Sequence, residues 1–352
     1  MKRRFTIITT ILCLALSLQG CVFTEVNTER VEEEVARKEA EEAAKEQAQQ
    51  TEDEQESDTV QSAVDEQQTE DLVPELEQIT AVEPLSDVQS AEENKFTCTY
   101  DGIGHDFILE FPEQIKGAPL IVMLHGYGGS AAGFKTDVGI EAVANENGYA
   151  VVYVTGAPNA KDATSANGWN SGIGDCDNRD AEFLVALVQY LENEYGFDET
   201  RTYAVGFSNG AFMIHRLALQ CGSTFEAFVS VAGMMPESMW NARPQDISVS
   251  FLQVTGQKDD VVPKNSDGSA DHSKAPAIEA VIEYYVSMDG LDKAEDEQIG
   301  KKATLTKYSN SSEQGDKIVW DVFIPDGRHS WPDVNITGID MNRLIMDFFE
   351  AQ

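Results

Sequence analysis

The sequence predicts an α/β fold for residues 96–352, with a mostly parallel β-sheet and helices on both of its faces. Continuous apolar runs such as Pro119–Leu124 and Tyr149–Val154 are typical of strands that are buried on both sides. Apolar residues at helical spacing mark Asp180–Tyr195 as an amphipathic helix. Because strand and helix patterns alternate along the stretch, we expect parallel strands joined by helical crossovers.

The remaining elements follow from the same two patterns. The expected strands are Phe96–Tyr100, Asp106–Phe111, Pro119–Leu124, Tyr149–Val154, Thr202–Phe207, Ala227–Val231, Val249–Val254 and Ile318–Ile324. The expected helices are Asp180–Tyr195, Asn209–Gln220, Ala277–Met288 and Ile339–Phe349. Since no repeat or second boundary interrupts this alternation, residues 96–352 are expected to form one domain.

The chain is strongly acidic. It contains 62 Asp and Glu against 25 Lys and Arg, a net charge of −37 over 352 residues. Proteins that neutralise nucleic-acid phosphates need clustered basic side chains, so this charge argues against a nucleic-acid partner.

Residues 1–20 have the pattern of a bacterial lipoprotein signal peptide. Basic residues 2–4 precede an apolar run, 5–18, which is too short for a comfortable membrane span. The run ends in Leu-Gln-Gly-Cys, so Cys21 is the expected lipidation site; an ordinary signal peptide is the alternative. Lipidation would hold the protein on a membrane at the cell surface without spanning it.

Residues 21–95 are expected to form a linker. Glu, Gln, Ala, Asp and Thr dominate, and residues 22–95 contain 24 acidic against 5 basic side chains. Such a composition buries too little apolar surface to offset the entropy of ordering. We expect a spacer that lifts the following domain off the membrane.

The sequence Gly206-Phe207-Ser208-Asn209-Gly210 matches the G-x-S-x-G pattern between an expected strand and an expected helix. The turn is tight, so small residues must flank the serine, and it lifts the hydroxyl above the sheet beside a helix N-terminus. Ser208 is therefore the candidate nucleophile.

A serine nucleophile needs a base and an acid that orients the base. His329 follows the last expected strand and completes the chain order Ser…Asp…His of this motif. The acid should follow an intervening strand, and both Asp259 and Asp260 come after Val249–Val254. These residues alone leave the two aspartates as alternatives.

A glycine-rich loop follows the strand that ends at Leu124. We expect the backbone amides of Tyr127 and Asn209 to form the oxyanion hole. His125 is expected to brace this loop, because the motif needs backbone donors there. No role is assigned to the other histidines, which are His105, His215 and His272.

Two tryptophans are candidate substrate contacts. Trp169 could line an acyl or sugar pocket or could plug its loop into the core, and Trp331 could touch substrate or brace the histidine loop. Asp175, Asp177 and Asp180 form an acidic group without EF-hand spacing, so no metal site is assigned. Asp180 could instead cap the helix that follows.

Together these motifs resemble the secreted esterases related to polyhydroxybutyrate depolymerases and to feruloyl and acetylxylan esterases. The matching segments are Leu124–Gly129, Gly168–Asn170, Arg179–Phe183, Thr202–Gly210, Gly256–Pro263 and His329–Pro332. The resemblance implies an α/β-hydrolase fold and a carboxylic-ester hydrolase with the triad Ser208, Asp259 and His329. It favours Asp259 over Asp260 because the family's acid comes three residues after the glycine and four before the proline.

Two departures from the family bear on the substrate. Ala211 stands where many relatives carry another glycine, and no separate polymer-binding domain of a granule depolymerase is visible. The second departure favours side-chain esters of plant cell walls over polyesters.

Cys98, Cys176 and Cys221 lie in the expected domain. An exported protein can contain a disulfide, and three cysteines allow one pair and a free thiol. Cys176 with Cys221 is the first choice.

The sequence therefore predicts a membrane-anchored extracytoplasmic serine esterase without a cofactor. The expected substrate is a feruloyl or acetyl ester on a polysaccharide such as xylan, or a small ester. A polyester depolymerase and a peptidase of the same fold are the enzymatic alternatives. A lipoprotein that binds glycans without catalysis is the alternative of another class.

Overall fold

A computed structural model of the chain describes residues 75–158, 166–173, 176–262, 275–312 and 317–352. The chain divides into two compact units, Met1–Leu72 and Val73–Gln352, and the described residues belong to the second. The predicted signal peptide, the lipidation site Cys21 and the predicted linker as far as residue 74 lie outside the described residues. Among the residues that the structure describes, no helix is long and apolar enough to cross a membrane.

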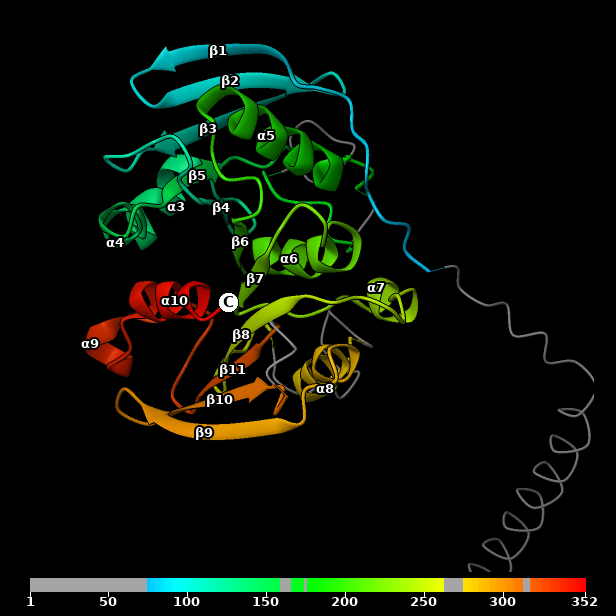
Figure 1. The fold of residues 1–352 in the computed structure, drawn as a ribbon, viewed down its shortest axis with the longest axis vertical. Helices are drawn as coiled ribbons and strands as arrows, with labels where there is room; N and C mark the ends of the chain where they lie inside the picture. The colour runs from blue at the N-terminus through cyan, green and yellow to red at the C-terminus, as the bar shows by residue number, and fades with distance from the viewer. Residues whose placement is uncertain (1–74, 159–165, 174–175, 263–274, 313–316) are drawn as a thin grey trace, which may run out of the picture. The chain divides into compact units, whose positions relative to one another are not determined.

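An eleven-stranded mixed sheet forms the centre of the unit Val73–Gln352 (Figure 1). In spatial order its strands are β1 (Ser86–Glu92), β2 (Lys95–Tyr100), β3 (Ile103–Glu110), β5 (Ala150–Val154), β4 (Leu120–Leu124), β6 (Thr202–Phe207), β7 (Ala227–Val231), β8 (Ser250–Gly256), β11 (Val319–Ile324), β10 (Ala303–Ser309) and β9 (Lys293–Ile299). The strands from β5 to β11 in this order run parallel, and the edge strands pair antiparallel. The carboxyl ends of the parallel strands therefore meet along one edge of the sheet, where ligand sites of such folds lie.

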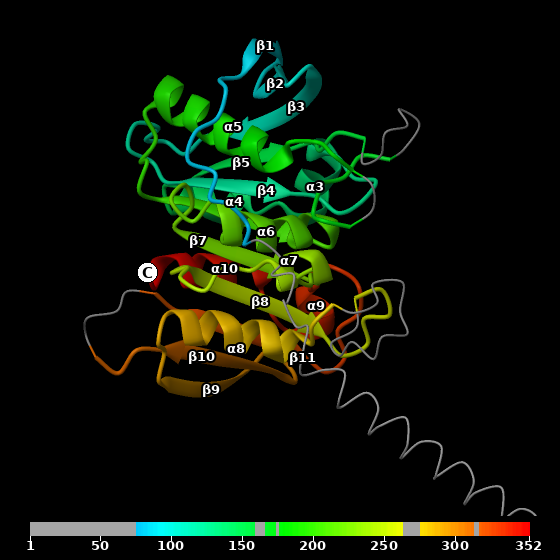
Figure 2. The ribbon, with the colours of Figure 1, turned by 90° about the vertical axis from the view of Figure 1, so that its right-hand side faces the viewer.

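Helices cover both faces because side chains alternate along each buried strand. In β4, Leu120, Val122 and Leu124 pack into one core cluster, whereas Ile121 and Met123 pack into the other. The first cluster is covered by α5 (Asp180–Tyr195), α6 (Asn209–Gln220), α7 (Glu237–Asn241) and α8 (Ile278–Met288). The second is covered by α3 (Ala131–Val138), α4 (Glu141–Glu146) and α10 (Met341–Glu350) (Figures 1 and 2).

The predicted strands and helices are confirmed, with small shifts at their ends. The sequence patterns missed the hairpin of β9 and β10, which extends the sheet at one edge. Six of the seven residues of β9 are exposed, so this strand has no apolar run by which it could be found. The helices α3, α4 and α7 and the short helix α9 (Val334–Thr337) were also not predicted.

The predicted linker boundary is wrong for residues 75–95. These residues lie against the domain: the Leu76 amide donates to Ala242 O at 2.8 Å, and the Ile79 amide donates to Gln220 O at 2.8 Å. Their apolar side chains pack onto the first core cluster, and β1 pairs with β2. The apolar residues of this stretch are sparse, which is why composition alone assigned it to the linker.

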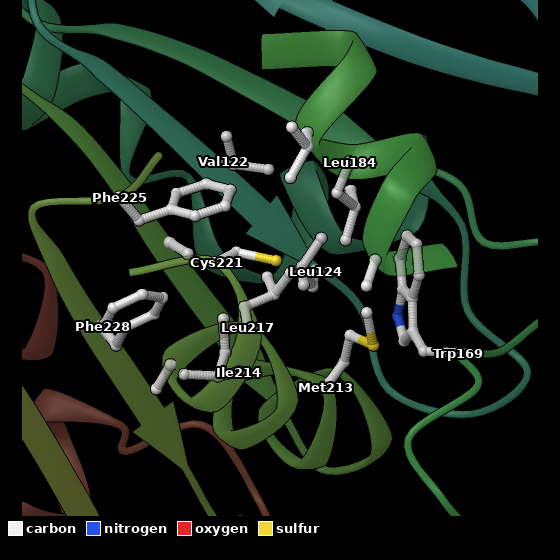
Figure 3. Packing of buried hydrophobic residues seen from close by; sticks show 14 of the residues in the cluster. Val122, Leu124, Trp169, Leu184, Met213, Ile214, Leu217, Cys221, Phe225 and Phe228 are labelled. Carbon is white, nitrogen blue, oxygen red and sulfur yellow. The ribbon is translucent and has the colours of Figure 1, made fainter. Parts of the chain in front are cut away.

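The predicted disulfide between Cys176 and Cys221 is also wrong. Cys98, Cys176 and Cys221 are all free thiols. Cys221 is the C-cap residue of α6. Its side chain is fully buried in the first cluster, among residues that include Leu217 (Figure 3). Cys176 lies half-buried in the loop before α5.

Candidate active site

Ser208 occupies a tight turn between β6 and α6. Its backbone has φ 53° and ψ −120°, a conformation that non-glycine residues rarely adopt. A Cβ on Gly206 would lie 2.3 Å from Gly210 O, and one on Gly210 would lie 2.3 Å from Leu124 O. Both glycines are therefore required for the strand, turn and helix to pass this closely.

The three residues predicted to carry the chemistry form one hydrogen-bonded line, which runs from Ser208 through His329 to Asp259. His329 Nε2 lies 2.9 Å from Ser208 Oγ, and His329 Nδ1 lies 2.9 Å from Asp259 Oδ2. Asp259 therefore accepts a hydrogen bond from the Nδ1–H group, which leaves Nε2 unprotonated and able to accept the hydrogen of the Ser208 hydroxyl. This is the arrangement that turns a serine hydroxyl into a nucleophile.

Of the two candidate aspartates, Asp259 is the one that contacts His329. The Asp259 side chain is 1% exposed, and its Oδ1 accepts the amide hydrogens of Val261 at 2.9 Å and Val262 at 2.7 Å. Asp260 is exposed and does not contact His329. Backbone donors and the imidazole thus hold both oxygens of the Asp259 carboxylate.

The loops that carry Asp259 and His329 are joined through their backbones. They follow the neighbouring parallel strands β8 and β11, and the Lys258 amide donates to Gly327 O at 2.8 Å. A Cβ on Gly256 would lie 2.6 Å from Gly327 O, so only glycine permits this approach. The pairing of β8 with β11 therefore brings the Asp259 and His329 loops together.

The glycine-rich loop after β4 lies against Ser208. A Cβ on Gly126 would lie 3.3 Å from the Ser208 Cβ. His125 braces the loop as expected: its Nε2 accepts the Gly156 amide hydrogen at 2.9 Å, so its Nδ1 carries a proton and donates to Gly126 O at 2.6 Å. Burial lowers the pKa of His125, which keeps this imidazole neutral.

The two residues predicted to supply oxyanion amides, Tyr127 and Asn209, directly follow Gly126 and Ser208, whose Cβ positions lie close together. Tyr127 follows Gly126, and its side chain is 61% exposed. Asn209 is the first residue of α6, where the amides of a helix N-terminus point outward without helical partners. The Asn209 side chain is buried.

Of the two interpretations of Trp169, a substrate contact and a core plug, its burial favours the plug. Trp169 is fully buried, and Figure 3 shows it among the core side chains. Its indole Nε1 donates to His125 O at 2.8 Å. The alternative, that Trp169 plugs its loop into the core, is the observed one.

Trp331 follows the histidine loop and is half-buried. Its ring lies edge-on to Phe134 at 5.8 Å between centroids. This contact favours the bracing interpretation of Trp331, because it ties the loop to α3.

Asp180 is the site-related residue whose role the sequence did not reveal. It does not cap α5, whose N-cap is Arg179. Its Oδ2 accepts the Asn170 amide hydrogen at 2.6 Å, and burial raises the pKa of the carboxyl to about 6. Asp175, another member of the acidic group noted in the sequence, lies outside the described residues. In the described part of the chain, no three side chains that could bind a metal ion lie together.

A cavity of about 150 Å³ adjoins the histidine loop. Its walls are mostly apolar and come from the carboxyl ends of β7, β8 and β11 and from α9. Arg328 and Ser330 line it on either side of His329, whereas Ser208, Asp259 and His329 do not. The cavity therefore adjoins the histidine loop without including Ser208 in its walls.

Comparison with known proteins places the chain among esterases. A family model described as "Esterase PHB depolymerase" matches residues 107–302, more than half of the 352 residues. A putative esterase NocK of Nocardia uniformis subsp. tsuyamanensis is 28% identical over 243 residues, 63% of this chain and 67% of that protein. A feruloyl esterase B of Thermothelomyces thermophilus is 30% identical over 156 residues, 42% of this chain and 52% of that protein. The chain thus spans about two thirds of the length of the first relative and about half of the length of the second.

A solved structure titled "Crystal Structure of sOPH Native" has the same fold. It superposes with a TM-score of 0.52 at 16% identity, over 74% of this chain and 88% of that one. The predicted α/β-hydrolase fold is thereby confirmed.

Proposed function

The chain belongs to the esterase PHB depolymerase family, and from this premise we propose that it hydrolyses carboxylic esters with Ser208 as the nucleophile. The observation that carries the proposal is the line Ser208–His329–Asp259, with 2.9 Å at both contacts of the imidazole. The strained turn at Ser208 adds support, since such backbone conformations cluster at functional sites.

In the proposed reaction, the Ser208 oxygen attacks the ester carbonyl carbon while His329 Nε2 takes the hydroxyl proton. The bond from the carbonyl carbon to the alcohol oxygen then breaks, and His329 gives its proton to the departing alcohol. Water attacks the acyl-serine, gives a proton to His329 and releases the acid. The proton returns to Ser208, and Asp259 stabilises the charged imidazole throughout.

The negative charge that develops on the carbonyl oxygen is proposed to be held by the amides of Tyr127 and Asn209. The close approach of Gly126 to Ser208 and the helix N-terminus at Asn209 support this assignment. Preorganised donors of this kind usually supply the largest share of transition-state stabilisation.

The proposed substrate is a feruloyl or acetyl ester on a polysaccharide such as xylan. Support comes from relatives named feruloyl esterase B and from a relative named bifunctional acetylxylan esterase/xylanase. A polyester is the second candidate, because the description of the matching family names a PHB depolymerase.

The test is hydrolysis by residues 22–352 of p-nitrophenyl acetate, methyl ferulate, acetylated xylan and a hydroxybutyrate oligomer. Ser208→Ala should lose activity by several orders of magnitude, whereas Ser330→Ala, a neighbouring exposed serine, should keep it. Equal activity in wild type and Ser208→Ala would refute the serine mechanism. Faster turnover of the oligomer than of the ferulate and xylan esters would move the substrate to polyesters.

We further propose that the protein is exported and held on a membrane by lipid at Cys21, from the signal pattern at residues 1–20. In cells, Cys21→Ser should move the protein from the membrane fraction to the soluble fraction. An unchanged distribution would refute lipid anchoring at this residue.

A further inference from the structure

Residues 168–171, here called the bracket, hold the side chain of Asn209. The Trp169 amide donates to Asn209 Oδ1 at 2.7 Å. The Asn209 Nδ2 group donates in turn to Trp169 O at 3.3 Å and to Ser171 Oγ at 3.2 Å. The residue whose amide is proposed to bind the oxyanion is therefore fixed by three hydrogen bonds to one segment.

The bracket also holds the opposite side of the proposed oxyanion hole. The Trp169 indole donates to His125 O, two residues before Tyr127. A Cβ on Gly156 would lie 2.3 Å from Gly168 O, so the bracket passes directly against the backbone that His125 Nε2 contacts. One segment thus sets the positions of both sequence regions that would supply oxyanion amides.

Two charged side chains hold the bracket itself at Asn170. Asp180 accepts the Asn170 amide hydrogen at 2.6 Å, and Arg216 Nη1 donates to Asn170 O at 2.6 Å. Asp180 begins α5, and Arg216 lies in α6, seven residues after Asn209. The Asn170 side chain adds a bond to Asn178 O at 2.7 Å.

Burying the Asp180 carboxylate costs solvation free energy, which a purely structural contact would not require. The residue is 1% exposed, and loss of solvation raises the pKa of its carboxyl to about 6, against the opposing effect of Arg216. Buried charged groups often stabilise a fold less than apolar residues of similar size would. Buried groups with displaced pKa values are concentrated at functional sites.

We propose that Asp180 and Arg216 are positioning residues of the oxyanion hole, which they hold in place through the bracket. The inference rests on the proposed esterase activity, because it concerns how the same site stabilises its transition state. Neither side chain touches substrate. Their effect reaches the reacting atoms through Asn170, Trp169 and Asn209.

The test compares Asp180→Ala, Asp180→Asn and Arg216→Gln with the matched control Glu182→Gln. Glu182 lies on the same first turn of α5, is half-buried and pairs with Arg179 rather than with a residue of the bracket. Loss of one oxyanion donor typically costs 10²–10³ in kcat, so a displaced donor should cost about 10-fold. We expect that loss in Asp180→Ala and Arg216→Gln, with KM within about twofold, partial rescue in Asp180→Asn and no change in Glu182→Gln.

Activity is expressed per active site, titrated with a phosphonate ester, so that misfolded protein does not count. The affinity for a boronic acid, whose tetrahedral adduct places an oxygen in the hole, should fall in parallel with kcat. If Asp180→Ala does not fold, Asn209→Ala, which keeps the amide and removes the side-chain bonds, should show the same loss. Unchanged kcat per titrated site in Asp180→Asn, Arg216→Gln and Asn209→Ala would overturn the inference.

Failure of this inference is distinguishable from failure of the proposed function. An active wild type and an inactive Ser208→Ala, together with fully active variants at Asp180, Arg216 and Asn209, would refute only the positioning role. Activity that survives Ser208→Ala would refute the proposed function itself.

Discussion

At the scale of single residues, close backbone approaches around Ser208 and backbone hydrogen bonds to Asp259 hold the side chains of the site. Ser208 could be predicted because the flanking glycines answer a local need, the close passage of strand and helix backbones. Asp259 could not be separated from Asp260 by residue type, since the amides of Val261 and Val262 decide which carboxylate turns inward. Trp169 could not be placed at all, because its partner Asn209 lies 40 residues away.

The two neighbouring aspartates provide a matched pair of variants. Asp259→Asn should keep its shape but hold His329 in the wrong tautomer, so kcat should fall by roughly 10³- to 10⁴-fold. Asp260→Asn should stay within about twofold of wild type, because its exposed side chain does not contact His329. Steady-state kinetics on p-nitrophenyl acetate measures both, and comparable losses in the two variants would contradict the assignment.

At the scale of elements, buried strands were predictable and exposed ones were not. The parallel strands are continuous apolar runs because both of their faces are covered. The edge strands β1 and β9 are mostly exposed and carry no such signal. Residues 75–85 were missed for a related reason: their spaced apolar residues bury themselves only against α6 and its neighbours, and Gln220 Nε2 donates to Glu77 O at 3.0 Å.

This packing predicts that residues 75–95 are part of the stable domain. A chain beginning at residue 96 loses Leu76, Ile79, Val82, Leu85 and Val88, which are partly buried against the core. At about half of the 1.5–3 kcal/mol for a fully buried side chain, the loss should be roughly 4 kcal/mol or more. Guanidinium unfolding of chains beginning at 75 and at 96 measures it, and equal unfolding midpoints would return these residues to the linker.

At the scale of the whole molecule, the site is assembled from loops at one edge of the sheet, supported by neutral buried histidines. Burial lowers the pKa of His215 to about 3 and that of His105 to about 4, and it also lowers that of His125. Sequence patterns left His105 and His215 without a role, since burial is a property of the finished fold. His215 hydrogen-bonds Tyr285 and Ser230 in the core.

Because burial lowers the pKa values of these histidines, we predict that acid destabilises the protein. In the unfolded chain His105 and His215 take protons near pH 6.5, but their folded pKa values lie lower. The stability that these two residues confer is therefore present above pH 6.5 and is lost as the pH falls toward 3–4. His215 alone should cost roughly 2 kcal/mol between pH 6.5 and pH 5, at 1.36 kcal/mol per pH unit. The raised pKa of Asp180 acts in the opposite direction below about pH 6 and offsets part of this loss.

Denaturant unfolding of wild type and His215→Gln at pH 7.5, 6.5 and 5 measures this contribution. The variant should be less stable at pH 7.5, because it disturbs a buried network, but its stability should fall less steeply with acid. Parallel pH dependence in the two proteins would show that His215 is not held neutral in the fold.

Covalent trapping of the nucleophile tests the central claim most directly. Residues 22–352 would be treated with a p-nitrophenyl phosphonate, which loses p-nitrophenol as it bonds to an activated serine, and peptides would be sequenced by mass spectrometry. The structure predicts one phosphonyl group per chain on Ser208, slow labelling in His329→Ala and none in Ser208→Ala. Labelling of another residue, or equal labelling of wild type and Ser208→Ala, would contradict a nucleophile at Ser208 activated by His329 and Asp259.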